Sequence, residues 1–272
     1  MQIIIPMTGY GSRFVAAGYQ ELKPLIEVQG IPILKWIIDG MYPGEQDILF
    51  VCRQEHLTSI PGMRERLLSI APTAEIFGVD DWEKKGPVYD VLRAGERIAD
   101  HGPCMINYCD FYMTWDYGKF KKDVSERDCD GCVPCYTGFH PHLLVEKNYY
   151  ASCLTDQSDN LLEIREKYSF AQDKTKARHS PGVYYFKTGE LLKKYCQKLV
   201  QSGQTINGEF YASLPYNFMV ADGRSVWVPM NVKQFCQWGT PEDLSDYLFW
   251  TECVRGFSDE YCDTNGRGRT EI

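Results

Sequence analysis

Membrane and export signals are missing from this sequence of 272 residues. No apolar run approaches the roughly 20 residues that a transmembrane helix needs. The first residues, MQIIIP, contain neither the basic region nor the cleavage site of a signal peptide. We therefore expect a cytoplasmic protein that does not act at a membrane.

Positively charged residues are also fewer than negatively charged ones. There are 29 Lys and Arg residues against 37 Asp and Glu residues, so the formal net charge is −8. Nonspecific nucleic-acid binding needs a basic surface, and this balance argues against it. Apolar residues make up 44% of the chain and charged residues 24%, which is ordinary for a globular protein and excludes a disordered or collagen-like chain.

Cysteine is frequent and odd in number, with 11 residues. Because no export signal is visible, we expect most of them to be reduced thiols. Cys129, Cys132 and Cys135 have a spacing that also occurs in zinc and iron–sulfur sites. The alternative is a strand, in which residues three apart point to opposite faces, and we favour that reading with buried thiols.

The first half of the chain alternates between strand-like and helix-like patterns. The buried run Ile3–Ile5 is typical of a parallel strand, and a glycine-rich loop follows it. Further strands are expected at 47–52, 74–79 and 103–109, with helices at 33–41, 56–70 and 88–98. This alternation predicts a mostly parallel sheet with helices on both faces.

The second half is richer in aromatic and β-branched segments. Strands are expected at 131–137, 149–154, 161–168, 182–187 and 225–229, and helices at 188–201 and 208–221. Thr240-Pro-Glu-Asp243 is typical of a helix start. We expect one domain over 1–255 and a loose polar tail over 256–272.

The glycine loop is the first candidate for chemistry. It reads Gly9-Tyr-Gly11-Ser-Arg13, with Lys23 ten residues further on. A strand followed by such a loop is a recurring phosphate cradle, because glycines let backbone N–H groups approach phosphate oxygens. A dinucleotide fingerprint would need glycine at Phe14, and the Walker A motif is absent. Two interpretations of the loop remain open. It is either a phosphate-binding loop assisted by the cations Arg13 and Lys23, or a tight turn with surface charges.

A series of motifs gives this loop a context. The segments concerned are 9–13, Lys23-Pro-Leu25, 86–94, 106–110, 163–167, 180–185, 207–211 and 237–244. In this order they resemble the motifs of the sugar-nucleotidyltransferase family. The resemblance covers about residues 1–250 and implies a GT-A-like, Rossmann-like α/β fold.

The same resemblance implies an enzyme, a nucleotidyltransferase. It would transfer a nucleoside monophosphate from CTP, UTP or GTP to a phosphorylated small molecule, with Mg²⁺ as cofactor and pyrophosphate as second product. A sugar 1-phosphate for surface-polysaccharide synthesis is the expected acceptor, and phosphocholine is an alternative. The base stays open, as does assembly into a homo-oligomer.

The resemblance of the motifs also implies roles for individual residues. The resemblance implies catalytic roles for Arg13, Lys23 and Asp110, with Asp110 also as metal ligand. It implies nucleotide contacts from the loop and its surroundings: Met7, Thr8, Gly9, Tyr10, Gly11, Ser12, Arg13, Lys23, Gly86, Pro87 and Asn107. It implies acceptor contacts from Glu166, Lys167, Gly182 and Glu209.

Three positions depart from the family pattern. Gln237 stands where the family commonly has an aspartate that binds the metal, and a neutral amide is a poorer Mg²⁺ ligand. Ser180 and Pro87 also differ from the usual residues, so acceptor and base specificity cannot be transferred from any subgroup.

Other interpretations stay open at this level. A glycosyltransferase on a similar fold typically carries Asp-x-Asp, whereas Asp110 is followed by Phe and Tyr112. A non-catalytic nucleotide-binding regulator would explain Gln237. His140 and His142 could bind a metal or form a wall of the acceptor pocket.

Overall fold

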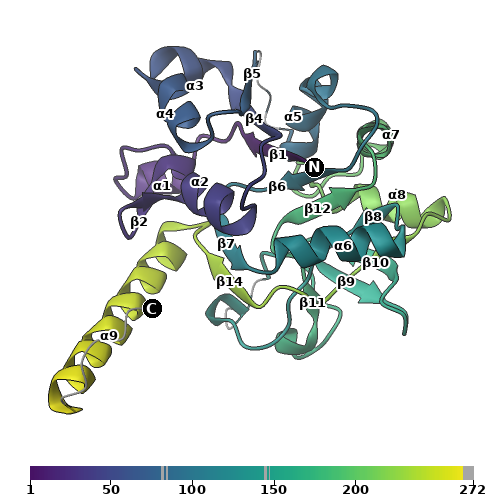
Figure 1. Cartoon of the computed structure of the whole chain (residues 1–272). Helices are drawn as coiled ribbons and strands as arrows, with labels where there is room; N and C mark the ends of the chain where they lie inside the picture. Colours follow the sequence, from purple (N-terminus) through teal and green to yellow (C-terminus); the bar gives the residue numbers. More distant parts are fainter. Residues whose placement is uncertain (81–82, 84, 144–145, 147, 266–272) are drawn as a thin grey trace.

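The computed structural model of the chain describes residues 1–80, 83, 85–143, 146 and 148–265 (Figure 1). A central sheet has the strand order β13–β8–β12–β6–β1–β4–β5. Its strands are β1 (Gln2–Met7), β4 (Ile48–Arg53), β5 (Glu75–Val79), β6 (Cys104–Asn107), β8 (Gly131–Cys132), β12 (Val183–Phe186) and β13 (Val226–Trp227). Only β12 runs against its neighbours, so the predicted mixed, mostly parallel α/β fold is confirmed.

Helices cover both faces of this sheet. One core contains side chains of α1 (Ser12–Ala16), α2 (Ile33–Lys35), the π-helical segment Trp36–Met41, α3 (Gln54–Ser59), α4 (Met63–Ile70) and α6 (Tyr117–Arg127). The other contains side chains of α5 (Pro87–Arg93), α7 (Gly189–Ser202) and α8 (Pro215–Ala221). β1 joins the two cores because its side chains alternate: Ile3 and Ile5 belong to the first, Ile4 to the second.

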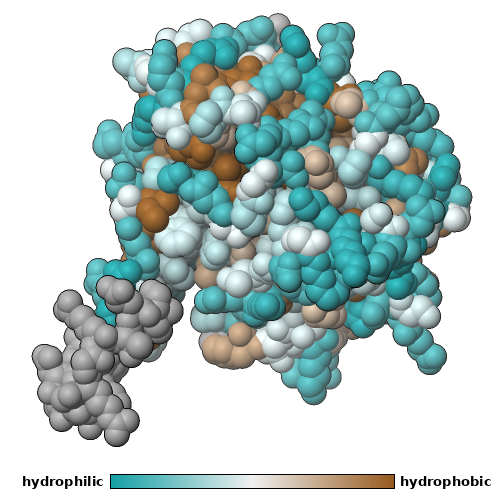
Figure 2. Space-filling model, viewed as in Figure 1, coloured by the Kyte–Doolittle hydropathy of each residue, from teal (hydrophilic) through white to brown (hydrophobic). Residues whose placement is uncertain are grey.

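Smaller sheets lie beside the central one. They are β10 (Leu161–Arg165) with β9 (Ser152–Thr155) and β11 (Arg178–His179), β14 (Gln234–Gln237) with β7 (Phe111–Thr114), and β2 (Glu27–Val28) with β3 (Ile31–Pro32). The β7–β14 pair matters most for function, because it sets Gln237 opposite Phe111, one residue beyond Asp110. In Figure 2 the visible face is mostly hydrophilic, and its apolar side chains gather in the upper half.

The last helix, α9 (Pro241–Asn265), projects from the body in Figure 1. Trp238, Thr240 and Asp243 anchor its start: the Asp243 amide donates to the Thr240 hydroxyl at 3.2 Å, and Trp238 packs edge-on against Tyr247. The loose tail expected from residue 256 is instead helical as far as Asn265, and 266–272 lie outside the described residues. Within the described part of the chain, no helix has the length and apolar character needed to cross a membrane.

Two expected helices differ from the structure. The helix predicted over 56–70 is divided into α3 and α4, because Pro61 lacks an N–H donor and Gly62 adopts a left-handed φ of 68°. The helix predicted over 208–221 begins only at Pro215. Non-helical backbone precedes it, and this segment forms part of the cavity wall described below for the site.

The strand expected over 131–137 is shorter in the structure, where β8 ends at Cys132, but the cysteines diverge as expected. Cys132 lies in the first core and Cys135 in the second, so the two side chains diverge across the sheet. Cys129 is also buried, and burial raises the pKa of its thiol to about 11. Among the described residues, no three His, Cys, Asp or Glu side chains gather in a way that could hold a metal ion.

Gly189, at the start of α7, provides a test of the packing between that helix and the chain after α5. A Cβ atom there would lie 2.1 Å from the carbonyl oxygen of Ala99, which is backbone and cannot rotate away. We predict that Gly189→Ala lowers the free energy of unfolding by about 1–3 kcal/mol, measured by urea denaturation. Gly95→Ala is the control, because its nearest neighbour would be a Lys193 side-chain carbon at 3.7 Å. Equal stability of the two variants would contradict this packing.

Candidate active site

The glycine loop leaves β1 at the carboxyl end of the parallel strands, where open α/β sheets bind ligands. Gly11 adopts the left-handed region with a φ of 62° and caps α1. A side chain there would also crowd Lys23, whose Cβ lies 3.4 Å from the position of the missing Cβ. Phe14 anchors the loop in the core, and Arg13 stays exposed beside it.

An ion pair joins this loop to the end of β6. The Lys23 ammonium lies 2.8 Å from an Asp110 carboxylate oxygen, and the two side chains are 17% and 35% exposed. The backbone of Asp110 is fixed from the other side, because its carbonyl accepts from the Trp238 amide at 3.1 Å. Three distant segments of the chain therefore meet at Asp110.

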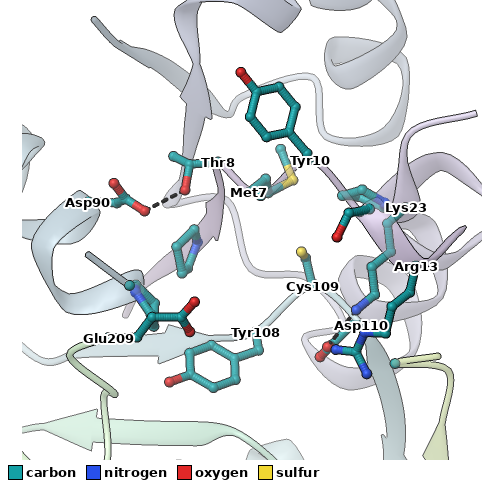
Figure 3. Close-up of a pocket in the computed structure, with 18 of the residues that line it drawn as sticks. Met7, Thr8, Tyr10, Arg13, Lys23, Asp90, Tyr108, Cys109, Asp110 and Glu209 are labelled. Carbon is teal, nitrogen blue, oxygen red and sulfur yellow. Dashed lines mark hydrogen bonds and ion pairs between the residues drawn. The ribbon is translucent and has the colours of Figure 1, made fainter. Parts of the chain in front are cut away.

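A cavity of 610 Å³ opens above this point (Figure 3). Its walls include nearly all the residues predicted to bind the nucleotide: Met7, Thr8, Gly9, Tyr10, Gly11, Ser12, Arg13, Lys23, Gly86 and Pro87. Gly86 permits a close approach of backbones, because a Cβ there would lie 2.8 Å from the Phe210 amide nitrogen, and its φ is 91°. In Figure 3 the cations Lys23 and Arg13 lie with Asp110 at one end, and Asp90 and Glu209 lie at the other.

A second cavity of 330 Å³ adjoins the first. It contains Glu166, Lys167 and Gly182, three of the four residues predicted to contact the acceptor. The two cavities share five wall residues: Arg13, Tyr108, Asp110, Tyr211 and Gly239. The structure therefore brings the predicted catalytic residues and most of the predicted binding residues into two connected spaces, with Arg13 and Asp110 at their junction.

Glu166 and Lys167 follow β10, and both line the second cavity. Burial raises the pKa of Glu166 to about 7, although a hydrogen bond from the Ser213 hydroxyl and the charge of Lys167 act in the other direction. The Lys167 ammonium lies over the Tyr211 ring, 5.1 Å from its centroid. Lys167 adopts a left-handed φ of 53°, which is uncommon for a residue with a side chain.

Two predicted residues lie elsewhere. Asn107 is fully buried and lines neither cavity: its side-chain oxygen accepts from Tyr42 at 2.6 Å, and its amide donates to the Tyr108 carbonyl at 2.7 Å. It holds β6 in place instead of facing a ligand. Glu209 lines the first cavity and not the second, because the Phe210 backbone beside it pairs with Lys85 next to Gly86.

The cavities also contain residues that the sequence alone did not indicate. Tyr108 and Tyr211 line both spaces, and the Tyr108 hydroxyl accepts from the Ala212 amide at 3.0 Å. Asp90 is a buried acid within α5, facing the first cavity. A carboxylate at an apolar-face position of a predicted helix is the signal that could have identified it.

The predictions for His140 and His142 have different outcomes. The His140 ring packs against Tyr136, with ring centroids 4.5 Å apart, and burial lowers its pKa. His140 lines neither cavity, so it does not form the wall of the acceptor pocket that was one of its expected roles. The side chain of His142 lies outside the described residues.

Oxygen atoms suitable as Mg²⁺ ligands lie at the junction and on the wall of the second cavity. Asp110 supplies a carboxylate, and the side-chain oxygen of Gln237 is buried without a hydrogen-bond partner in the described structure. The Gln237 amide nitrogen donates to Asp243 at 2.5 Å, which turns this oxygen away from Asp243. One carboxylate and one amide oxygen fit a hard cation that takes its other ligands from phosphates and water.

Comparison with known proteins places this geometry among solved structures. No family model and no curated protein matches the chain. A nucleoside-diphosphate-sugar pyrophosphorylase from Vibrio cholerae RC9 matches with a TM-score of 0.74 at 20% identity, over 91% of this chain and 99% of that one. A glucose-1-phosphate thymidylyltransferase described as putative, from Bacillus anthracis, matches with a TM-score of 0.67 at 15% identity, over 90% and 93% of the chains.

An inositol-1-phosphate CTP transferase from T. maritima matches with a TM-score of 0.66 at 14% identity, over 89% of this chain and 90% of that one. The chain therefore has the fold of these structures over most of its length. This fold is the one that the resemblance of its motifs implies.

The raised pKa of Glu166 predicts a pH-dependent stability. Between the ordinary carboxyl value of 4.5 and about 7, the folded protein keeps a proton that the unfolded chain has released, so stability falls as pH rises. We predict that Glu166→Gln removes this slope and that the variant gains about 2 kcal/mol over the parent protein between pH 5 and pH 8. Thermal unfolding across this range checks it. Parallel curves for the two proteins would contradict the assignment.

Proposed function

We propose that the protein is a nucleotidyltransferase that transfers a nucleoside monophosphate from an NTP to a phosphorylated small molecule and releases pyrophosphate. The observation that supports this most is the meeting of two cavities at Arg13 and Asp110, with a lysine on each side. Lys23 stands on the side of the first cavity and Lys167 on the side of the second. Two anionic ligands would be held with their phosphates facing each other.

In this proposal the first cavity takes the NTP. Backbone N–H groups of the glycine loop are suited to phosphate oxygens, and the planar guanidinium of Arg13 is suited to bidentate contact with the β- and γ-phosphates. Lys23, already paired with Asp110, would contact the α-phosphate. The remaining length of the cavity is available for the ribose and base.

The second cavity takes the acceptor, whose phosphate Lys167 would hold. An acceptor phosphate oxygen attacks the α-phosphorus, forms the new P–O bond, and the bond from the α-phosphorus to the bridging oxygen of the β-phosphate breaks. The electron pair leaves with pyrophosphate. Because the attacking oxygen is already an anion at pH 7, no general base is needed, and positioning and charge neutralisation account for the rate.

Asp110 and the Gln237 amide oxygen would hold Mg²⁺ together with substrate phosphates. A bound Mg²⁺ would neutralise charge that develops on the phosphate oxygens. The Gln237 side-chain oxygen is buried without a hydrogen-bond partner in the described structure, which supports its use as a neutral ligand at the position where the family commonly has an aspartate. A sugar 1-phosphate is the acceptor we expect from the resemblance of the motifs.

The reaction is tested by pyrophosphate release. The full-length protein is mixed with Mg²⁺, each of the common NTPs, and a panel of sugar 1-phosphates, inositol 1-phosphate and phosphocholine. We expect pyrophosphate to appear with at least one pair, together with a nucleotide-linked product, and to require both substrates and Mg²⁺. Release with no pair would remove the transferase proposal, and transfer of sugar from an NDP-sugar would favour the glycosyltransferase.

The separate roles of Arg13 and Lys167 predict different kinetic losses. Arg13→Ala should lower kcat by about 100-fold or more, because the leaving phosphates lose their positive partner. Lys167→Ala should raise the KM of the acceptor by about tenfold or more while the KM of the NTP changes little. Lys176→Ala is the control, because that exposed lysine lines neither cavity. Equal effects of Lys167→Ala on both KM values would contradict the assignment of the second cavity.

A further inference from the structure

A buried polar network supports the first cavity at the end away from Lys23 and Arg13. The Thr8 hydroxyl donates to the Asp90 carboxylate. The Thr8 carbonyl in turn accepts two hydrogen bonds from the Arg53 guanidinium, at 2.7 and 3.0 Å. Thr8, Asp90 and Arg53 are only 5%, 2% and 3% exposed. The motifs of the sequence assign no role to Asp90 or Arg53.

The network fixes the position of the Asp90 carboxylate. Asp90 comes from α5, Thr8 from the glycine loop and Arg53 from the end of β4, so three elements hold it. Burial lowers the pKa of Arg53, while the charge of Asp90 is among those that act in the other direction. A guanidinium keeps its charge in proteins, so a lasting positive charge lies near this carboxylate.

The charges of the first cavity are divided between its two ends. Lys23 and Arg13 lie at one end with Asp110, and Asp90 and Glu209 lie at the other (Figure 3). An NTP whose phosphates contact the two cations would extend its base toward the end with Asp90. The base would then meet a fixed carboxylate at the edge where nucleobases differ from one another.

An ionised carboxylate accepts hydrogen bonds and donates none. Cytosine, adenine and guanine carry exocyclic amino groups that donate, guanine on C2 beside its O6 oxygen. Uracil and thymine carry none and present the O4 oxygen where cytosine has its amino group. Oxygen facing a fixed carboxylate leaves two acceptors opposed without a proton between them, which is costly beside a carboxylate that is only 2% exposed.

We propose that Asp90 is a specificity-determining residue that selects nucleotides whose base carries an exocyclic amino group. The proposal rests on the proposed function, because it takes the first cavity as the NTP site. It assigns to Asp90 a contact with substrate, in addition to its hydrogen bond with Thr8. A merely structural acid, present to balance the charge of Arg53, would stabilise the protein without affecting the choice of base.

The test is equilibrium binding of CTP, GTP, ATP, UTP and dTTP to the full-length protein with Mg²⁺ and no acceptor, by calorimetry. We expect at least one of CTP, GTP and ATP to bind about tenfold or more tightly than both UTP and dTTP. In Asp90→Asn the amide can turn its N–H₂ group toward O4, so this ratio should fall toward one. Glu55→Gln is the matched control: that carboxylate lies 3.8 Å from Arg53, is 61% exposed and lines neither cavity, so the ratio should not change.

The possible results distinguish a failure of the role of Asp90 from a failure of the proposed function. Binding of UTP or dTTP as tight as that of the best amino-bearing nucleotide overturns the role of Asp90 and leaves the proposed function intact, and this holds even if Asp90→Asn does not fold. An unchanged ratio in a folded Asp90→Asn variant also overturns it. If no NTP binds to the parent protein, the proposed function fails first and the base selection with it.

Discussion

The ion pair between Lys23 and Asp110, 2.8 Å long, is the interaction around which the site is arranged. It connects the segment after the glycine loop to the carboxyl end of β6. Because both side chains are partly buried, water screens the pair less than a surface pair. Around it the chain collects Arg13 and Lys167, so the protein has a local concentration of positive charge although its formal net charge is −8.

The central sheet explains why these charges can meet. Parallel strands place the loops after β1 and β6 at the same edge, and β14 reaches that edge by pairing with β7. The same alternation that divides Ile3, Ile4 and Ile5 between two cores also separates Cys132 from Cys135. The alternation of side chains along a strand thus accounts for the two cores and the cysteines, whereas the parallel direction of β1 and β6 accounts for the position of the site.

Local sequence was sufficient to predict the parts of the molecule that local forces determine. The buried run of β1, the loop that follows it and the order of strands and helices needed only hydrophobic patterns and glycine positions. The residues of the two cavities were identified by the resemblance of their motifs to a known family. Asn107 could not be placed this way, since its burial depends on Tyr42, 65 residues away. Glu209 faces the first cavity because of backbone pairing between Phe210 and Lys85, which no periodicity reveals. The role of Asp90 likewise depends on the nonlocal partners Thr8 and Arg53.

In the proposed function, one ligand's phosphates lie at Arg13 and Lys23 while the second ligand's phosphate lies at Lys167. A crystal structure of the protein with Mg²⁺, an NTP analogue that cannot be cleaved between the α- and β-phosphates, and an acceptor that supports turnover tests it most directly. We expect the triphosphate along the glycine loop, and the acceptor phosphate on Lys167 with one oxygen facing the α-phosphorus. Phosphates bound away from Arg13 and Asp110, or both ligands in one cavity, would contradict it.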